Sequence, residues 1–253
     1  MCKRPSRLSD AICRQLMRVR QQVKPVGLIP ADGPPKAQEL VESDPFAFLM
    51  AGCLDRGMPA EIIWGLPYCL KRVLGHLDPC RLAAMTEGEI RSDLYQLDKK
   101  PRYINAAPRT VSQVSQMVCK EFGGKAEALW HNTSARKVQD RLRQIYGVGP
   151  GIASMIVILL ERLRWAHFED LYDVNVKPDV HVQRVMYRLG LVDRMSEAEA
   201  ICAARALSPH YPGELDTPLW WIGKHWCFDT NSECGKCPMD DLCPKRGLRE
   251  TNL

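Results

Sequence analysis

The chain has 253 residues, of which 45% are hydrophobic and 26% are charged. This length allows one large or two modest domains, and the apolar content is sufficient for a real core. No apolar run approaches the roughly 20 residues that cross a membrane, and no apolar segment follows the basic N-terminus as in a signal peptide. The formal net charge of +5 is compatible with a polyanionic partner but is too small to prove one.

The order of the elements predicts an all-α fold. Apolar spacing predicts a helix from Leu8 to Val23, and the four prolines and two glycines from Lys24 to Lys36 predict a linker. Beyond the linker nearly every segment has helical periodicity, and strand-like alternation is scarce. We expect helix breaks near Gly65-Leu66-Pro67, Leu77-Asp78-Pro79, Pro101, Gly123-Gly124 and Gly190.

Residues 134–164 contain two helical patterns joined by a glycine-rich turn. The apolar positions at helical spacing are Ala135, Val138, Leu142 and Ile145, followed by Ile152, Met155, Ile156, Leu159, Leu160 and Leu163. Gly147, Gly149 and Gly151 permit positive φ and close approach of another backbone, so the N–H groups of the turn can point at a phosphate oxygen. An ordinary αα turn would use the same glycines for tight packing.

Asp179 precedes a third apolar stripe, which Gly190 ends. This position predicts a helix N-cap. A capping aspartate commonly does no more than accept hydrogen bonds from the first N–H groups of its helix. The same position can also direct a carboxylate into a cleft.

Eleven cysteines in a chain without an export signal favour thiols or metal ligands over a disulfide framework. Four of them are separated by six, two and five residues, and these are Cys227, Cys234, Cys237 and Cys243. Zinc and an iron-sulfur cube both take four thiolates, and this compact spacing favours the cube. The other seven, at positions 2, 13, 53, 69, 80, 119 and 202, are expected to be small buried or surface residues.

These motifs together resemble those of a known family. Residues 146–153 (YGVGPGIA) and 178–185 (PDVHVQRV) are similar to the helix-hairpin-helix and aspartate signature of the endonuclease III family of DNA glycosylases. The cysteine spacing is similar to the pattern that binds a [4Fe-4S] cluster in that family. The resemblance covers roughly residues 40 to 245.

The resemblance implies two helical lobes with a DNA groove between them. Residues 1–40 would form an N-terminal helix and linker, and residues 41–167 a six-helix domain with the helix-hairpin-helix at 134–164. Residues 168–253 would form the iron-sulfur cluster domain, which packs with the N-terminal helix. Asp179, at the start of that domain, would lie in the groove.

The resemblance also implies base-excision repair of double-stranded DNA that contains a damaged or mispaired base. Such an enzyme flips the nucleotide out of the duplex and hydrolyses its N-glycosidic bond. Asp179 would stabilise positive charge on the sugar and align or deprotonate the attacking water. We expect a monomer without membrane contact, located in the cytoplasm with the nucleoid.

This chain departs from the family at the position of the lyase lysine, where it has Gly151. Without an amine there, no Schiff base forms, so we predict a monofunctional glycosylase. Lys177 is an alternative amine that would restore lyase activity. A DNA-binding protein without significant excision activity is a further alternative.

Two more departures concern DNA contacts. Arg56 and Gly57 stand where relatives carry a glutamine that probes the base stack, so Arg56 either fills the hole left by a flipped base or is a solvated loop residue. The loop at 228–233 is acidic where the family is usually basic, which shifts phosphate binding toward the hairpin. The residues expected to contact DNA are Gly147, Val148, Gly149, Gly151 and Arg56.

Overall fold

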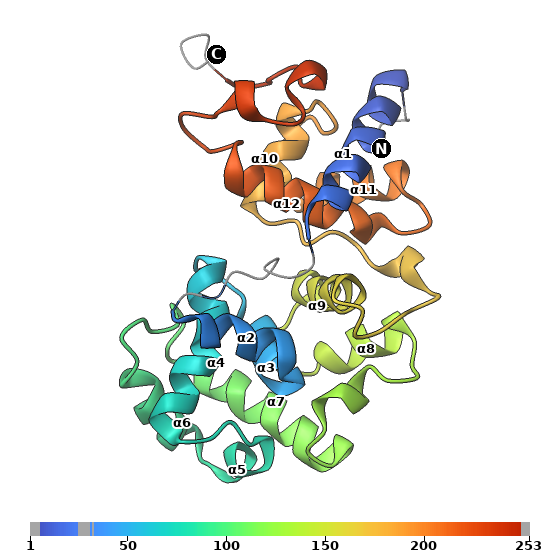
Figure 1. Cartoon of the computed structure of the whole chain (residues 1–253). Helices are drawn as coiled ribbons and strands as arrows, with labels where there is room; N and C mark the ends of the chain where they lie inside the picture. The colour runs from blue at the N-terminus through green and yellow to red at the C-terminus, as the bar shows by residue number, and fades with distance from the viewer. Residues whose placement is uncertain (1–5, 25–30, 32, 249–253) are drawn as a thin grey trace. The chain divides into compact units, whose positions relative to one another are not determined.

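The computed structural model describes residues 6–24, 31 and 33–248 (Figure 1). These residues form twelve α-helices and five short 3₁₀ helices and contain no β-strand, which confirms the predicted all-α class. None of the described helices has both the length and the apolar character that crossing a membrane requires.

The chain folds as two compact units, which we call the terminal unit and the central unit. The terminal unit contains residues 1–24 and 169–253, and the central unit contains residues 25–168. Most of the linker predicted between Lys24 and Lys36 lies outside the described residues, and its last two residues belong to a helix.

The central unit contains eight of the α-helices, whereas the resemblance implied about six. Several of the eight are short, and the shortest is α5 with 6 residues. In chain order the eight are α2 (Pro35–Ser43), α3 (Pro45–Leu54), α4 (Ala60–Leu74), α5 (Pro79–Ala84), α6 (Glu87–Tyr95), α7 (Ala107–Phe122), α8 (Ala135–Leu142) and α9 (Pro150–Arg162).

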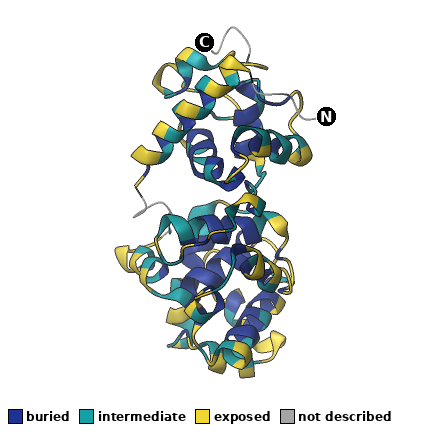
Figure 2. Ribbon diagram, turned by 90° about the vertical axis from the view of Figure 1, so that its right-hand side faces the viewer, coloured by how far each residue is buried: buried dark blue, intermediate teal, exposed yellow. Residues whose placement is uncertain are grey.

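Helix α3 lies at the centre of this unit, because it packs against α2, α4, α7 and α9. The buried residues of the unit are dark blue in Figure 2. Asp44 caps α3 by accepting hydrogen bonds from two backbone N–H groups, and every residue from Phe46 to Leu54 is buried. Gly52 lets α3 approach α9 closely, because a Cβ there would lie only 2.9 Å from Cγ1 of Ile156 in α9. The side chain of Phe48 packs against three tryptophans, at 64, 130 and 165.

One predicted break is wrong. Residues 65–67 lie inside α4 and are buried, although Pro67 cannot donate an intrahelical hydrogen bond. The packing of α4 against α2 and α3 outweighs that local cost. The break near Gly123 is confirmed, since this residue ends α7 with φ of 59°, and so is the one at Gly190, with φ of 73°.

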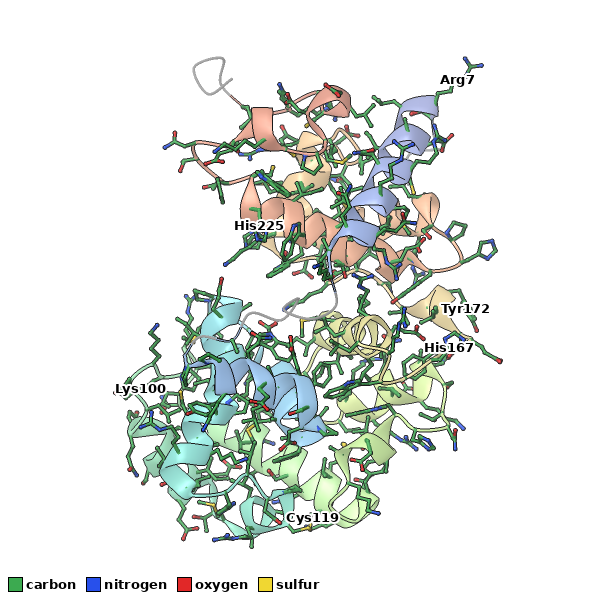
Figure 3. The ribbon with its side chains drawn as sticks, in the orientation of Figure 1. Arg7, Lys100, Cys119, His167, Tyr172 and His225 are labelled. Carbon is green, nitrogen blue, oxygen red and sulfur yellow. A yellow bond between two sulfur atoms is a disulfide. The ribbon has the colours of Figure 1, made fainter. Side chains whose placement is uncertain are left out.

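A disulfide joins Cys80 in α5 to Cys119 in α7, the helix on which Figure 3 labels Cys119. The expectation that these two cysteines carry no bond is therefore wrong. The cause is tertiary: α5 and α7 pack side by side and bring two cysteines 39 residues apart in sequence to a Cα separation of 4.9 Å.

The terminal unit contains the first helix and the last three. Helix α1 (Arg7–Gln22) confirms the predicted N-terminal helix and buries Ile12, Leu16 and Val19. Helices α10 (Val180–Arg188) and α12 (Asp216–His225) pack closely against each other, and α11 (Glu197–Leu207) lies between them in the sequence.

Candidate functional site

The hairpin consists of α8, a turn at 143–149 and α9. In the turn the Val148 N–H donates to the Ile145 carbonyl at 3.1 Å, and Val148 is buried. Of the three glycines that permit positive φ, only Gly147 adopts it, at +81°. Gly149 is extended and caps α9, and Gly151 lies within its first turn.

The turn presents backbone donors to solvent. Within the described part of the chain, the N–H groups of Gly147 and Gly149 donate to no protein acceptor. A Cβ on Gly149 would meet nothing within 4 Å, so the space in front of it is open. The first N–H groups of a helix also lack intrahelical partners, and the helix dipole makes this end attractive to anions. This turn can therefore bind a phosphate oxygen.

Arg56 lies directly against this turn. Its guanidinium occupies the space that a Cβ of Gly147 would take, and its Nη2 donates to Oγ1 of Thr110 at 3.0 Å. The same guanidinium stands 5.8 Å and 5.9 Å from the ring centroids of Tyr103 and Tyr146. The structure thus brings Arg56 together with the hairpin residues of the predicted site.

Asp179, in the terminal unit, is the N-cap of α10. Its Oδ1 accepts hydrogen bonds from the N–H groups of His181 at 2.9 Å and Val182 at 3.0 Å. Its Oδ2 makes no hydrogen bond to any residue that the structure describes. The capping role fixes one oxygen and the orientation of the carboxylate, and the other oxygen is available to a ligand.

The four predicted cluster cysteines lie in the same unit, and all are partly buried. Burial raises the pKa of the Cys237 thiol to about 11, and the three neighbouring cysteines raise it as well. The pKa values of Cys234 and Cys243 are also raised, chiefly by burial. The thiols therefore influence one another, although no three His, Cys, Asp or Glu side chains of the described ranges are spaced to hold a single metal ion.

Two buried arginines of α10 bind the backbone around the first cysteine. Arg184 donates from Nε to the Cys227 carbonyl at 2.8 Å and from Nη2 to the Gly223 carbonyl at 3.1 Å. Arg188 donates from Nη1 to the Cys227 Sγ at 3.3 Å and to the Phe228 carbonyl. The burial of these two arginines was not predicted from the sequence. The available signal was two arginines one turn apart on a helix that is otherwise largely apolar on its buried face.

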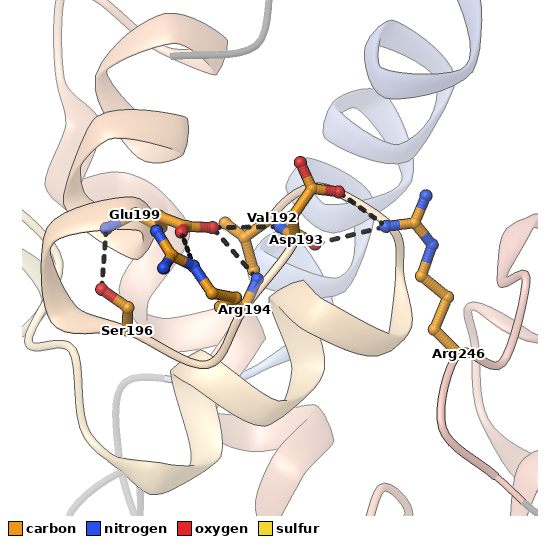
Figure 4. Close-up of polar contacts among 6 residues, drawn as sticks. All are labelled: Val192, Asp193, Arg194, Ser196, Glu199 and Arg246. Atoms are coloured by element: carbon orange, nitrogen blue, oxygen red, sulfur yellow. Dashed lines mark hydrogen bonds and ion pairs between the residues drawn. The ribbon is translucent and has the colours of Figure 1, made fainter. Parts of the chain in front are cut away.

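The end of the cysteine segment is tied to the loop after α10 (Figure 4). Arg246 donates from its backbone to the Arg188 carbonyl at 3.3 Å and pairs with the Asp193 carboxylate at 3.3 Å. Glu199 accepts from the N–H groups of Asp193 and Arg194 at 3.0 Å each. Hydrogen bonds from Arg194 lower the pKa of the Glu199 carboxyl.

No protein-family model and no curated protein sequence matches this chain. Solved structures do match it. A trapped covalent intermediate of endonuclease III with DNA, an estranged-adenine complex, aligns over 94% of this chain and 96% of its own, with a TM-score of 0.64 and 19% identity. A non-covalent endonuclease III–DNA complex aligns over 94% and 95%, with a TM-score of 0.61 and 20% identity. The chain has the endonuclease III fold. A thermostable thymine-DNA glycosylase aligns over 93% and 95%, with a TM-score of 0.58 and 14% identity.

The endonuclease III fold agrees with the all-α fold class that the sequence predicted. The structure also locates Gly151, which stands at the position of the lyase lysine, and Lys177, the alternative amine. Gly151 is exposed only in part at the start of α9, and the backbone N–H of Lys177 donates to the Asp216 carboxylate at 2.6 Å.

His181, two residues after Asp179, lies against Arg184 in a partly buried position. Its Nδ1 lies 3.0 Å from Nη2 of Arg184, which can only donate, so Nδ1 accepts and the ring proton lies on Nε2. Burial lowers the pKa of this imidazole, and the charge of Arg184 lowers it further, whereas Asp179 raises it.

This lowered pKa predicts a pH dependence of stability. The unfolded chain binds a proton at position 181 below pH of about 6.5, before the folded protein does. The free energy of unfolding should therefore fall as the pH drops from 7 through that value, and less so in His181→Asn, whose amide oxygen can replace the Nδ1 acceptor. Urea denaturation at several pH values measures this, with exposed His131→Gln as control. Equal pH dependence in wild type and His181→Asn would contradict it.

Proposed function

We propose that this chain is a DNA glycosylase of base-excision repair that belongs to the endonuclease III family. The observation that carries the proposal is Asp179, a helix-capping carboxylate with one uncommitted oxygen, in a chain with the endonuclease III fold. The substrate we propose is double-stranded DNA with one damaged or mispaired base.

The hairpin turn would anchor one strand. The open N–H groups at Gly147 and Gly149 and the N-terminus of α9 offer donors to a phosphate oxygen, and the space in front of Gly149 is free of side chains. Such contacts carry no sequence information, which suits an enzyme that must search along any duplex. The unit that contains Asp179 would contact the same duplex.

The Asp179 carboxylate would act on the flipped nucleotide. Loss of the base leaves oxocarbenium-like positive charge on the sugar, as in other glycoside cleavage. The free Oδ2 would stabilise that charge and orient or deprotonate the attacking water, while Oδ1 stays bound to the helix N–H groups. One carboxylate is sufficient for this reaction.

Gly151 supports a monofunctional enzyme. A lyase needs an amine to attack the sugar and form a Schiff base, and glycine offers none at this position. Lys177 is the alternative amine, and its backbone is fixed beside Asp179 by the Asp216 carboxylate.

A [4Fe-4S] cluster held by Cys227, Cys234, Cys237 and Cys243 is part of the proposal. The residues fit such a group: four partly buried thiols influence one another, and the buried guanidinium of Arg188 provides a compensating positive charge. The bound group would supply structural cross-links that order residues 227–243. It takes no part in the base removal proposed for Asp179.

The first test is single-turnover incubation of the purified protein with duplexes that each carry one modified or mispaired base. We expect strand breaks on at least one duplex only after alkali treatment, because base removal leaves an abasic site intact. We also expect no covalent adduct with borohydride. Breaks without alkali together with a trapped adduct would instead support a lyase that uses Lys177. Duplex binding without breaks on any substrate would support a DNA-binding protein without excision.

The second test is Asp179→Asn. The amide oxygen can still cap α10, but the side chain loses its charge and its basicity, so excision should slow by about 10²- to 10⁴-fold. Duplex affinity should stay within a few-fold of wild type. Asp10→Asn, an exposed carboxylate of α1 in the same unit and outside both proposed sites, is the matched control. Unchanged excision by Asp179→Asn would remove Asp179 from the mechanism.

A further inference from the structure

The backbone of Tyr146 in the hairpin turn is held at both of its polar groups by side chains of α7. Its N–H donates to Oε1 of Gln113 at 2.6 Å, and its carbonyl accepts from Oγ1 of Thr110 at 2.9 Å. Thr110 has an exposed fraction of 0%, so it cannot touch a ligand in solution. The turn is thus fixed by α7 from inside the central unit.

Arg56 completes this connection. A threonine hydroxyl has a single proton, and the nearer of its two carbonyl acceptors is that of Tyr146, at 2.9 Å against 3.5 Å for Ala106. With the proton donated to Tyr146, the oxygen accepts from Nη2 of Arg56 at 3.0 Å. The result is a relay from the guanidinium through the hydroxyl to the carbonyl of the turn. Because charged donors make the stronger hydrogen bonds, the guanidinium also strengthens the next bond of the relay.

The guanidinium is restrained from other sides too. It fills the space beside the α-carbon of Gly147 that any side chain would need, and it lies between the rings of Tyr103 and Tyr146. These contacts use the planar fork of arginine, which the compact ammonium of lysine does not reproduce. All the residues concerned belong to the central unit.

We propose that Arg56 is a positioning residue for the hairpin turn, acting through Thr110, and not a side chain that enters the DNA. It keeps residues 146–149 in the conformation that presents the N–H groups of Gly147 and Gly149 outward. A turn that is ordered before binding loses less conformational entropy when it takes up a phosphate. This consequence for DNA rests on the proposed function, whereas the effect on the turn does not.

The experiment compares Thr110→Val and Arg56→Lys with wild type in the full-length protein. The valine keeps the shape of the buried threonine without its hydroxyl, and the lysine keeps the charge of Arg56 without its fork. Ser115→Ala is the matched control, because Ser115 is another buried hydroxyl of α7 and donates only to Val111 of its own helix. Thr110→Ser, which keeps the hydroxyl, should restore wild-type behaviour.

The first readout is hydrogen exchange in the absence of DNA. The amides of Tyr146 and Val148 should exchange about 5- to 10-fold faster in Thr110→Val and in Arg56→Lys, as expected for the loss of one internal hydrogen bond. Ser115→Ala should leave both rates unchanged. Arg56 is partly exposed, so Arg56→Lys should fold even if Thr110→Val does not. If these amides exchange at the wild-type rate in Arg56→Lys, the proposal is overturned.

The second readout is duplex affinity against salt concentration. A positioning role predicts that Thr110→Val and Arg56→Lys bind several-fold more weakly at every salt concentration, with the slope of log K against log salt unchanged. Wild-type affinity in Arg56→Lys would show that charge alone is needed and would overturn the proposal. If wild type itself does not bind duplex, the proposed function fails, while hydrogen exchange still decides the role of Arg56.

Discussion

The terminal unit depends on two buried guanidinium groups of one helix. A buried positive charge is tolerated only when its N–H groups are satisfied, and Arg184 and Arg188 satisfy theirs mainly with backbone carbonyls near Cys227 and one thiol. This requirement fixes the path of the chain around the first cysteine. It also fixes α10, whose N-cap is Asp179, so one rigid helix connects the proposed catalytic carboxylate to the cysteine segment.

In the central unit, too, an arginine stabilises a segment of backbone. Arg56 is only partly buried, but its guanidinium supports a turn in which Gly147 and Gly149 have no side chains to hold the backbone. A glycine-rich turn offers open N–H groups because it lacks side chains, and for the same reason it is conformationally free. The order that glycine cannot provide comes from α7 and from Arg56. In both units an arginine therefore stabilises backbone that a ligand is proposed to use.

Much of the fold follows from local rules that can be read along the sequence. The helix at the N-terminus, the cap at Asp179 and the helix ends at Gly123 and Gly190 depend on neighbours within a few residues, and each was predicted correctly. The spacing of the apolar positions from Ile152 to Leu163 also predicted the helix that the structure shows as α9.

Other features depend on residues far apart in sequence and were wrong or missed. Packing keeps Pro67 inside α4, and the contact of α5 with α7 creates the disulfide of Cys80. The hydrogen bonds of Arg188 reach residues about 40 positions away. The local pattern shows two arginines one turn apart on this helix, but it does not show which distant groups they bind. The contacts of Arg56 with Tyr103, Thr110 and Tyr146 were missed for the same reason, because these partners are far from Arg56 in the sequence.

The most direct test of the account asks whether both units act on one DNA molecule. Hydrogen exchange would be measured on the full-length protein, free and with a duplex that carries a stable abasic-site analogue. The account predicts slower exchange in two separate segments of the same complex, the hairpin turn at 146–152 and the start of α10 at 180–182. Slower exchange at the hairpin alone would leave Asp179 without contact to the DNA and would contradict the central claim.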